Sequence, residues 1–404
     1  MPRPLEGVRV LALEQMQSLP FATQLLARLG ADVVKVEPPP AGELGRSSQP
    51  AMTDPQGRPV GATFLRNNLG KRSLVIDLKD PRGRDLLLQL APRFDVVAEN
   101  FKSGSAARLG LAFDDVRAVH PSVVYLSVSG FGSLAETPYR EWPALAIVVE
   151  AMSGLYEAKR REGEPPQTAP AGALGDIGAA LFATVGVLAA LRQRDRTGEA
   201  QFVDIAMLDA VLAMTDVIVN YWSLGVPGGA IGPLVSAGFR AADGWFVLQV
   251  SREPHFEALA RLLDRPEWIG DPRFATRTGW VEHQEDVLRP AIEGWAAGRT
   301  KLEACEALAA AGIAAGPCFS EPEVAADPHV AARHMLVPMA RTDGVERPVL
   351  APGNPVKLLG VPEADEERVP WVGEHTDEVL RAELGLGDDE LAALRADGVI
   401  SGGG

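Results

Sequence analysis

The sequence predicts an α/β protein with two parts: a large domain containing a mostly parallel, doubly wound sheet, and a smaller α+β domain. Three observations lead to this fold class. Apolar strand-like runs alternate with helix-like segments up to Gly130, the pattern then changes to longer helices, and a Gly- and Pro-rich stretch precedes a second unit. The chain has 404 residues, 46% of them hydrophobic, so it can bury a large core and is longer than one compact domain usually is.

The first part of the chain alternates strands with helices. The run VRVLALE after Gly7 predicts a strand, residues 20–29 predict a helix that ends at Gly30, and residues 32–37 predict a second strand. Strands joined through helices pair in parallel, so this alternation implies a doubly wound sheet. The same rhythm continues with predicted strands at residues 73–78, 95–99 and 123–128, a helix opened by Pro81 and a short helix near Asp114.

Helices dominate beyond Gly130. They are predicted over residues 144–152, 177–192 and 208–224, with the strand QFVDIAM between the last two. The stretch from Gly225 to Pro233 is typical of a linker, and GWFVLQV with the short helices after it indicates a smaller α+β unit. The chain then returns to strands and loops and ends in a helix. The expected organisation is a large domain over residues 1–224, a linker and small domain over 225–335, and a return segment over 336–404 that completes the large domain.

Charge and cysteine content restrict the partners and the compartment. With 54 acidic and 39 basic side chains the net charge is −15, which repels a phosphate backbone, so we expect no nucleic-acid partner. Two cysteines, Cys305 and Cys318, cannot form a disulfide framework, as expected in a reducing cytoplasm. The first residues lack the pattern of a secretion signal, and the longest apolar stretch, residues 179–191, is shorter than the roughly 20 residues of a membrane helix. We therefore expect a soluble, cytoplasmic protein with no membrane segment.

Asp176 is a candidate nucleophile. It follows Gly175 and precedes the apolar run IGAALFATVGVLAAL, which places it at the N-cap or in the first turn of a helix. The dipole and the free N–H groups of a helix start favour an ionised carboxylate, which is the form that attacks. The spacing alone favours a plain capping aspartate, since Asp is among the preferred N-cap residues.

Basic residues gather close to predicted strand ends. Lys102 and Arg108 lie just beyond the strand at 95–99, where ligands bind in open α/β sheets, and both are suited to hold the phosphates of a nucleotide. Lys71 and Arg72 precede their strand, so this rule applies to them less well. Solvated surface charge is the alternative explanation for all four side chains.

Two other kinds of site are excluded. The pair Gly130 and Gly132 lacks the third glycine and the downstream acid of a dinucleotide fingerprint, so no nicotinamide site is expected. None of the six histidines has a partner at metal-ligand spacing, and we expect no metal.

Eight blocks in nearly the whole chain carry a family resemblance. They are GVRVLALEQMQSLPFATQLLARLGADVVKVEPP, NLGKRSLVIDLKDPRG, DVVAENFKSG, ALGDIGAALFATVGVLAAL, GEAQFVDIAMLDA, AAGIAAGPC, DPHVAARHM and GEHTDEVL. In order and spacing they resemble the class III CoA-transferases, a group that includes formyl-CoA transferase, carnitine CoA-transferase and, as a divergent branch, α-methylacyl-CoA racemase.

The resemblance implies a CoA-transferase that moves coenzyme A from an acyl-CoA donor to a carboxylic acid acceptor. It implies that Asp176 is the nucleophile of a covalent aspartyl anhydride and aspartyl-CoA thioester pathway, with Gln17 close to the intermediate. It further implies a Rossmann-like large domain, an interlocked ring-like homodimer, and CoA as a substrate rather than a permanently bound cofactor. The implied CoA contacts are Gln17, Ser18, Lys71, Arg72, Ile76, Asp77, Leu78, Lys79, Asn100, Phe101, Lys102 and Arg108.

The chain also departs from parts of the family. The racemase branch needs a histidine about thirty residues before the aspartate, but residues 141–150 read EWPALAIVVE, so a two-base mechanism is absent unless a glutamate replaces the histidine. Formyl-CoA transferase carries a long glycine-rich flap, whereas this chain offers only Gly228-Gly229 before Ala230, which argues against formyl and oxalyl groups as substrates. An acyl-CoA racemase or epimerase and a non-catalytic CoA-binding protein are the two alternatives.

Overall fold

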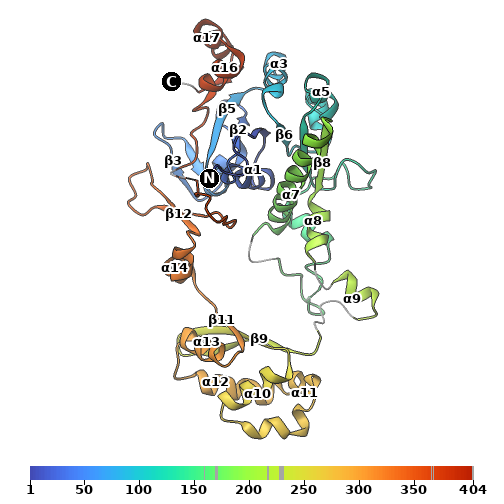
Figure 1. Cartoon of the computed structure of the whole chain (residues 1–404), viewed down its shortest axis with the longest axis vertical. Coiled ribbons are helices and arrows are strands. Elements are labelled where there is room, and N and C mark those ends of the chain that lie inside the picture. The colour runs from blue at the N-terminus through green and yellow to red at the C-terminus, as the bar shows by residue number, and fades with distance from the viewer. Residues whose placement is uncertain are drawn as a thin grey trace. The chain divides into compact units, whose positions relative to one another are not determined.

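The structure is a computed structural model, and it describes residues 1–158, 160–168, 172–215, 218–226, 232–364, 366 and 368–402 (Figure 1). Its contacts divide the chain into two compact units. Unit 1 combines residues 1–219 with residues 332–404, and unit 2 covers residues 220–331. The boundaries expected from the sequence lie within a few residues of these, at 224/225 and 335/336. Residues 228–230, which include the two glycines compared with the formyl-CoA transferase flap, lie outside the described residues.

Unit 1 is built on a seven-stranded sheet with the order β14-β5-β2-β1-β6-β7-β8. Every neighbouring pair is parallel except β14 with β5. Without β14, the six parallel strands follow the order 3-2-1-4-5-6 of doubly wound nucleotide-binding folds. In this order successive strands are added first on one side of β1 and then on the other, so the strand order reverses between β1 and β6. The strands are β1 (Arg9–Leu13), β2 (Asp32–Glu37), β5 (Lys71–Ile76), β6 (Val96–Glu99), β7 (Val124–Ser129), β8 (Gln201–Ala206) and β14 (Ile400–Ser401).

Alternating side chains divide the core of unit 1 into two layers. In β1, Val10 and Ala12 belong to one buried cluster, and Leu11 and Leu13 belong to the other. Successive strand side chains point to opposite faces, so both faces of the sheet are covered. The first cluster joins the sheet to α1 (Ser18–Arg28), α6 (Ala146–Met152), α7 (Leu174–Thr197) and α8 (Met207–Met214). The second joins it to α3 (Pro81–Leu90), α5 (Phe113–Val119), α16 (Thr376–Leu384) and α17 (Asp388–Ala396).

The elements of unit 1 differ from the sequence prediction in three respects. Helix α7 begins at Leu174, three residues earlier than predicted, so it includes Asp176. The continuous helix predicted over 208–224 is wrong, because Thr215 leaves the helical region (φ −79°, ψ 105°) and ends α8. Several short elements had no sequence prediction: α2 (Ala62–Asn67), α4 (Ser105–Leu109), and the hairpin of β3 (Ala51–Thr53) and β4 (Pro59–Gly61).

The C-terminal segment returns to unit 1. It forms the hairpin of β12 (Leu336–Met339) and β13 (Val349–Pro352), then α16, α17 and β14. Ile400 of β14 pairs with Ile76 of β5, and Figure 1 shows α16 beside β5. Residues 336–402 therefore belong to unit 1.

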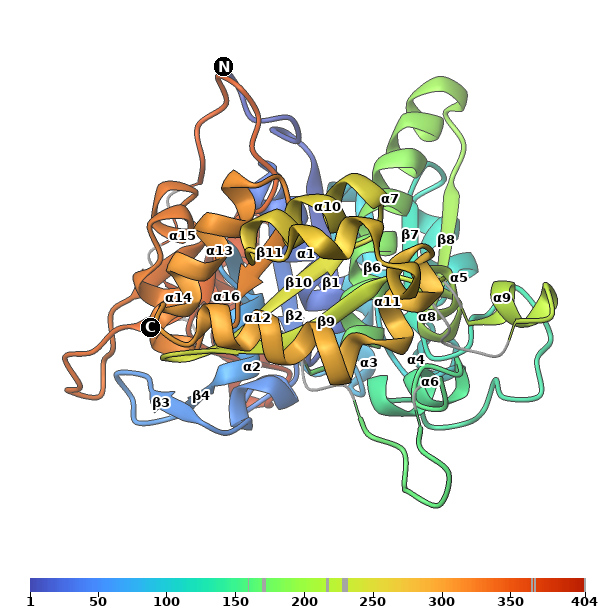
Figure 2. The same ribbon diagram turned by 90° about the horizontal axis from the view of Figure 1, so that it is seen from below.

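Unit 2 has its own small sheet and core. Strands β9 (Val235–Ala241), β10 (Gly244–Val250) and β11 (Ala314–Pro317) pair antiparallel. Figures 1 and 2 show helices α10 (Glu253–Leu262) and α12 (Arg289–Ala296) over one face of this sheet, around a core that includes Phe256 and Trp280. The other α-helices of unit 2 and its edges are α9 (Val219–Ser223), α11 (Arg277–Glu282), α13 (Lys301–Ala310), α14 (Glu321–Ala326) and α15 (Pro328–Ala332).

Helix α7 has one buried side and one exposed side. Of the described helices it is the one long and apolar enough to cross a membrane by length and composition, and half of its most apolar stretch is buried in the protein. A core helix of a soluble protein meets the same criteria. Leu181, Val185 and Leu188, spaced for one helical face, are exposed by 45%, 63% and 37%.

Candidate active site

Asp176 is the third residue of α7, not its N-cap, which is Ala173. The glycines on either side permit the close packing of this helix start. A Cβ at Gly175 would lie 2.8 Å from Val149 of α6, and a Cβ at Gly178 would lie 2.3 Å from the Met214 side chain of α8. The GDIG sequence thus brings the first turn of α7, with its carboxylate, directly against neighbouring helices.

The electrostatic surroundings of Asp176 oppose its ionisation. Burial raises its pKa to about 6, hydrogen bonds from the Ser18 side chain and backbone lower it, the charge of Glu150 raises it, and the charge of Arg66 lowers it. The sequence predicted that the helix start favours the ionised form; burial has the largest effect on the pKa of Asp176 and acts in the opposite direction. At neutral pH the carboxylate is still the major form, and its negative charge is less stabilised than in water.

Glu150 of α6 is a second buried carboxyl group beside Asp176, with 2% of its surface exposed. Its Oε1 accepts a hydrogen bond of 3.0 Å from the backbone N–H of Gly175, and its Oε2 accepts one from the Tyr156 hydroxyl. Ala173, the N-cap of α7, has no side-chain acceptor for the free N–H groups of the helix start, and Glu150 supplies one. It also fixes a negative charge next to Asp176.

The turn from β1 to α1 presents Gln17 and Ser18 to this region. Gln17 is the N-cap of α1, and its side chain is partly exposed, whereas Ser18 is buried. Asn100, at the end of β6, donates to the carbonyl of Gln15 and accepts from its N–H, both at 2.9 Å. The Asn100 side chain therefore ties this turn to the carboxyl end of β6.

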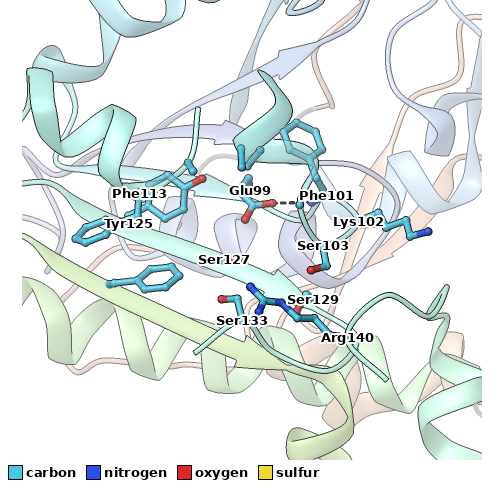
Figure 3. A pocket seen from close by; sticks show the side chains of 15 residues that line it. Glu99, Phe101, Lys102, Ser103, Phe113, Tyr125, Ser127, Ser129, Ser133 and Arg140 are labelled. Atoms are coloured by element: carbon cyan, nitrogen blue, oxygen red, sulfur yellow. Dashed lines mark hydrogen bonds between the residues drawn. The ribbon is translucent and has the colours of Figure 1, made fainter. Parts of the chain in front are cut away.

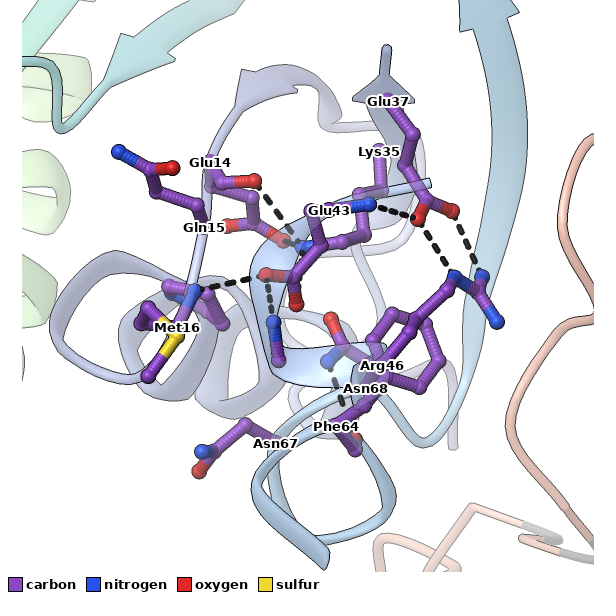
Figure 4. A network of polar contacts seen from close by, with 12 residues as sticks. Glu14, Gln15, Met16, Lys35, Glu37, Glu43, Arg46, Phe64, Asn67 and Asn68 are labelled. Carbon is purple, nitrogen blue, oxygen red and sulfur yellow. Dashed lines mark hydrogen bonds and ion pairs between the residues drawn. The ribbon is translucent and has the colours of Figure 1, made fainter. Parts of the chain in front are cut away.

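A buried ionic cluster lies beneath the same turn (Figure 4). Glu14 accepts a 2.6 Å ion pair from Lys71 and lies 3.5 Å from Lys35. Burial opposes the ionisation of Glu14, but Lys71 and Lys35 outweigh it and lower its pKa. Burial likewise lowers the pKa of Lys71, to about 8, so both partners remain charged at neutral pH.

Glu43 connects this cluster to the turn. Its Oε2 accepts hydrogen bonds from the N–H of Met16 (2.9 Å) and of Gly45 (2.6 Å), and its Oε1 lies 3.5 Å from the Lys35 ammonium (Figure 4). Met16 has a positive φ of 63°, a conformation that is unfavourable for its side chain. The Glu43 carboxylate therefore fixes a strained residue immediately before Gln17.

A second buried pair supports the first. Arg46 donates to both oxygens of Glu37, at 2.6 and 2.7 Å, and its guanidinium lies 3.6 Å from the centre of the Phe64 ring. Burial opposes ionisation of Glu37, but Arg46 holds its pKa at about 2. The segment after β2 is thus locked to α2.

The predicted phosphate-binding cations lie beyond the carboxyl end of β6, where Arg108 donates a hydrogen bond of 2.7 Å to the Ser105 hydroxyl. Lys102 and Arg108 are exposed, and neither forms an ion pair with any carboxylate in the described part of the chain. Lys102 and Phe101 line a pocket of about 160 Å³ together with Glu99, Ser127 and Arg140 (Figure 3). Burial raises the pKa of Glu99, which accepts a hydrogen bond from Phe101 N–H.

The other predicted contacts divide between two edges of the sheet. Ile76 ends β5, and the Asp77 side chain accepts from the N–H of Lys79, whose side chain is exposed. Arg72 pairs instead with Asp32, which begins β2, so it lies at the opposite, amino edge. Lys71 is bound inside the ionic cluster described above. The geometry favours structural roles for Lys71 and Arg72.

Some residues of this site were not found from the sequence. Glu150, Arg66, Glu43 and Lys35 act on Asp176 or on the turn that faces it, yet they come from four different elements or loops. Of these, only Glu150 had a signal, because it ends the segment in which a glutamate was considered as a replacement for histidine. In the described ranges no three His, Cys, Asp or Glu side chains gather as metal ligands would.

Comparisons with known proteins show the family to which the chain belongs. The model of CoA-transferase family III matches residues 5–376. The chain is 35% identical to a formyl-CoA:oxalate CoA-transferase of Streptomyces avermitilis, with 99% of this chain and 100% of that protein covered. It is 36% identical to a succinyl-CoA–D-citramalate CoA-transferase of Chloroflexus aurantiacus, with 99% and 98% covered. The crystal structure of a CaiB/BaiF family protein from Brucella suis superimposes with a TM-score of 0.82 at 30% identity, covering 95% of this chain and all of that one.

The Asp176 carboxyl group should titrate near pH 6, and Glu150→Gln should lower its pKa because the neighbouring negative charge is removed while the burial remains. The measurement is a carboxyl-carbon NMR titration of aspartate-labelled protein, with Asp176→Asn identifying the signal. Glu162→Gln, which neutralises an exposed glutamate, is the matched control and should leave the midpoint unchanged. A wild-type midpoint below about 4, the ordinary value, would contradict this description of the site.

Proposed function

The chain belongs to CoA-transferase family III and is a class III CoA-transferase, and we propose that it transfers coenzyme A between two carboxylic acids through covalent intermediates on Asp176. The observation that carries the proposal is the placement of Asp176. Its carboxyl group lies in the first turn of α7, faces Ser18 from the β1–α1 turn, and has its pKa raised to about 6. A carboxylate that is less stabilised than in water, but still ionised at neutral pH, is suited to nucleophilic attack.

In the first half of the proposed reaction, a carboxylate oxygen of Asp176 attacks the thioester carbonyl of the donor. The C–S bond breaks, CoA leaves as the thiolate, and Asp176 carries the acyl group as a mixed anhydride. The thiolate then attacks the aspartyl carbonyl. This step releases the donor acid as its carboxylate and leaves an aspartyl-CoA thioester.

In the second half, the carboxylate of the acceptor attacks the aspartyl thioester and expels the thiolate. A second mixed anhydride forms, now between Asp176 and the acceptor. The thiolate attacks the acyl carbonyl of the acceptor, which gives the new acyl-CoA and restores the Asp176 carboxylate. No net proton is consumed, and the thiolate stays bound throughout.

CoA itself is proposed to lie across the carboxyl ends of the sheet, near the switch between β1 and β6, where such folds bind nucleotides. Lys102 and Arg108 are the proposed phosphate contacts, since both are exposed and neither forms an ion pair within the described chain. The remaining proposed contacts are Gln17, Ser18, Ile76, Asp77, Leu78, Lys79, Asn100 and Phe101. CoA is a substrate in this scheme and is not permanently bound.

Glu150 does not favour the racemase alternative. It is the acid that could replace the missing histidine, but it is buried and both its oxygens accept hydrogen bonds from the protein. A base that removes an α-proton must reach substrate. Exchange of solvent deuterium into the α-carbon of a branched acyl-CoA would nevertheless reveal such an activity.

We further propose that the protein is a homodimer with interlocked subunits. The exposed face of α7 with Leu181, Val185 and Leu188 is an apolar surface of the kind that a second subunit covers. Large-unit segments at both chain ends, around a separate middle unit, support the interlocked arrangement. A cytoplasmic location is proposed from the two free cysteines, Cys305 and Cys318.

Asp176→Asn should abolish transfer, because it removes the nucleophile while preserving side-chain size. With wild-type protein, donor alone should suffice to modify Asp176. Hydroxylamine should convert the intermediate to a hydroxamate at that position, detected by peptide mass. Transfer by the Asn variant at wild-type rates, or a label on another carboxylate, would disprove the covalent role of Asp176.

Lys102→Ala and Arg108→Ala should raise KM for the acyl-CoA with little change in kcat, because phosphate contacts lie far from the reacting carbon. Loss of one charge-assisted contact corresponds to roughly ten- to over a hundredfold in affinity. Arg93→Ala, an exposed arginine before β6, is the matched control. Unchanged KM values in both test variants would place the nucleotide elsewhere.

The dimer should persist in sedimentation velocity at sub-micromolar concentration, since interlocked subunits cannot separate without unfolding. Val185→Glu, which places a charge in the middle of the exposed α7 face, should reduce the yield of dimer, whereas Val119→Glu, at an exposed position of α5, should not. A stable monomer with full activity would refute the arrangement.

A further inference from the structure

Arg66 is an unpaired cation near the proposed nucleophile. It lies near the end of α2 and is partly buried. Its side chain makes one hydrogen bond to the described residues, a 3.3 Å contact to Asn67 Oδ1, although a guanidinium carries five N–H donors. Arg28, whose charge is nearby, differs from Arg66. Its guanidinium forms an ion pair with Glu366 at 2.7 Å and donates hydrogen bonds to two backbone carbonyls.

The position of Arg66 is fixed by the backbone beneath it. The buried amide of Gln24, in α1, donates to the Arg66 carbonyl at 3.0 Å and accepts from Leu69 N–H at 2.8 Å. Both contacts join the end of α2 to α1. Arg66 therefore projects from an anchored segment rather than from a loose loop.

Helix α1 connects Arg66 with Asp176. The Arg66 guanidinium lies 5.2 Å from the centre of the Phe21 ring, and Phe21 is three residues beyond Ser18 on the same helix face. Side chains at this spacing are about 5–6 Å apart between Cβ atoms. Since Ser18 is close enough to Asp176 to lower its pKa, the guanidinium and the carboxyl group flank one short stretch of α1.

Resting on the function proposed above, we propose that Arg66 binds the free carboxylate of a dicarboxylic substrate whose other carboxyl group reacts at Asp176. The substrate class is thus an acid with a second carboxylate a few carbons from the first, such as a four-carbon dicarboxylate. A guanidinium suits this role because it binds a carboxylate with two parallel hydrogen bonds.

The charge balance around Arg66 supports an anionic ligand. Burial and the nearby charge of Arg28 lower its pKa, and Asp176 only partly compensates. In the mixed anhydride and in the thioester, Asp176 is no longer charged. Arg66 is then a partly buried cation without an anion, unless the substrate supplies one.

The test compares two donors of equal carbon number, succinyl-CoA and butyryl-CoA, in a single-turnover assay of Asp176 modification by peptide mass. Wild type should prefer the succinyl donor. Arg66→Met should slow the succinyl reaction by roughly ten- to over a hundredfold more than the butyryl reaction, because both reactions lose the same charge near Asp176 and only the succinyl donor loses a carboxylate contact. Arg66→Lys should retain part of the preference. Arg93→Met, an exposed arginine at the amino edge, should change neither rate.

The ratio of the two rates within one variant does not depend on the fraction of protein that is folded. Equal slowing of both donors, an unchanged ratio in Arg66→Met, or a wild-type preference for butyryl-CoA would each overturn the assignment of Arg66. Asp176→Asn is measured alongside. If it still reacts, the covalent mechanism fails; if it is inactive and the ratio is unaffected by Arg66→Met, the inference about Arg66 fails alone.

Discussion

The turn between β1 and α1 depends on ion pairs buried directly beneath it. Glu14 pairs with Lys71, and Lys35 bridges Glu14 and Glu43. Removing one member of a buried pair leaves an uncompensated charge, which costs about 3–5 kcal/mol, whereas the intact pair adds little net stability over apolar packing. The cluster therefore matters mainly because it fixes the position of the turn, and not because it adds stability. Through Glu43 it holds Met16 in a left-handed conformation, and Met16 determines where Gln17 and Ser18 begin α1.

The same arrangement explains why Asp176 can be both close to a helix start and hard to ionise. A first-turn carboxylate gains from the helix dipole and from Ser18, but it is packed against α6, where Glu150 already occupies the N–H of Gly175. Gly175 allows this proximity because a side chain there would collide with Val149. One close helix contact thus sets both the burial of Asp176 and the negative charge beside it.

The strand and helix alternation of unit 1 could be predicted because the parallel strands are buried on both faces and appear as continuous apolar runs. Asp176 could be located because its block joins glycine, aspartate and a long apolar helix. The ionic cluster could not, since Glu14 and Lys71 are 57 residues apart in the chain and Lys35 sits inside an apolar strand. Arg66 lies on a six-residue helix, too short for a periodic signal. The roles of such residues depend on tertiary contacts, which local sequence patterns do not reveal.

Two charges of opposite sign near Asp176 can serve different stages of the proposed cycle. Glu150 disfavours the free carboxylate, and this repulsion disappears once the oxygen is acylated, so Glu150 lowers the relative free energy of the anhydride and the thioester. Arg66 acts in the other direction on the free carboxylate, but its charge becomes available when Asp176 is neutralised. A substrate carboxylate that pairs with Arg66 therefore binds most strongly in the anhydride and the thioester, where Asp176 no longer competes for the guanidinium. Binding energy that appears only there favours the reaction rather than the resting complex. On this reasoning the second carboxyl group of the substrate contributes to rate as well as to selectivity.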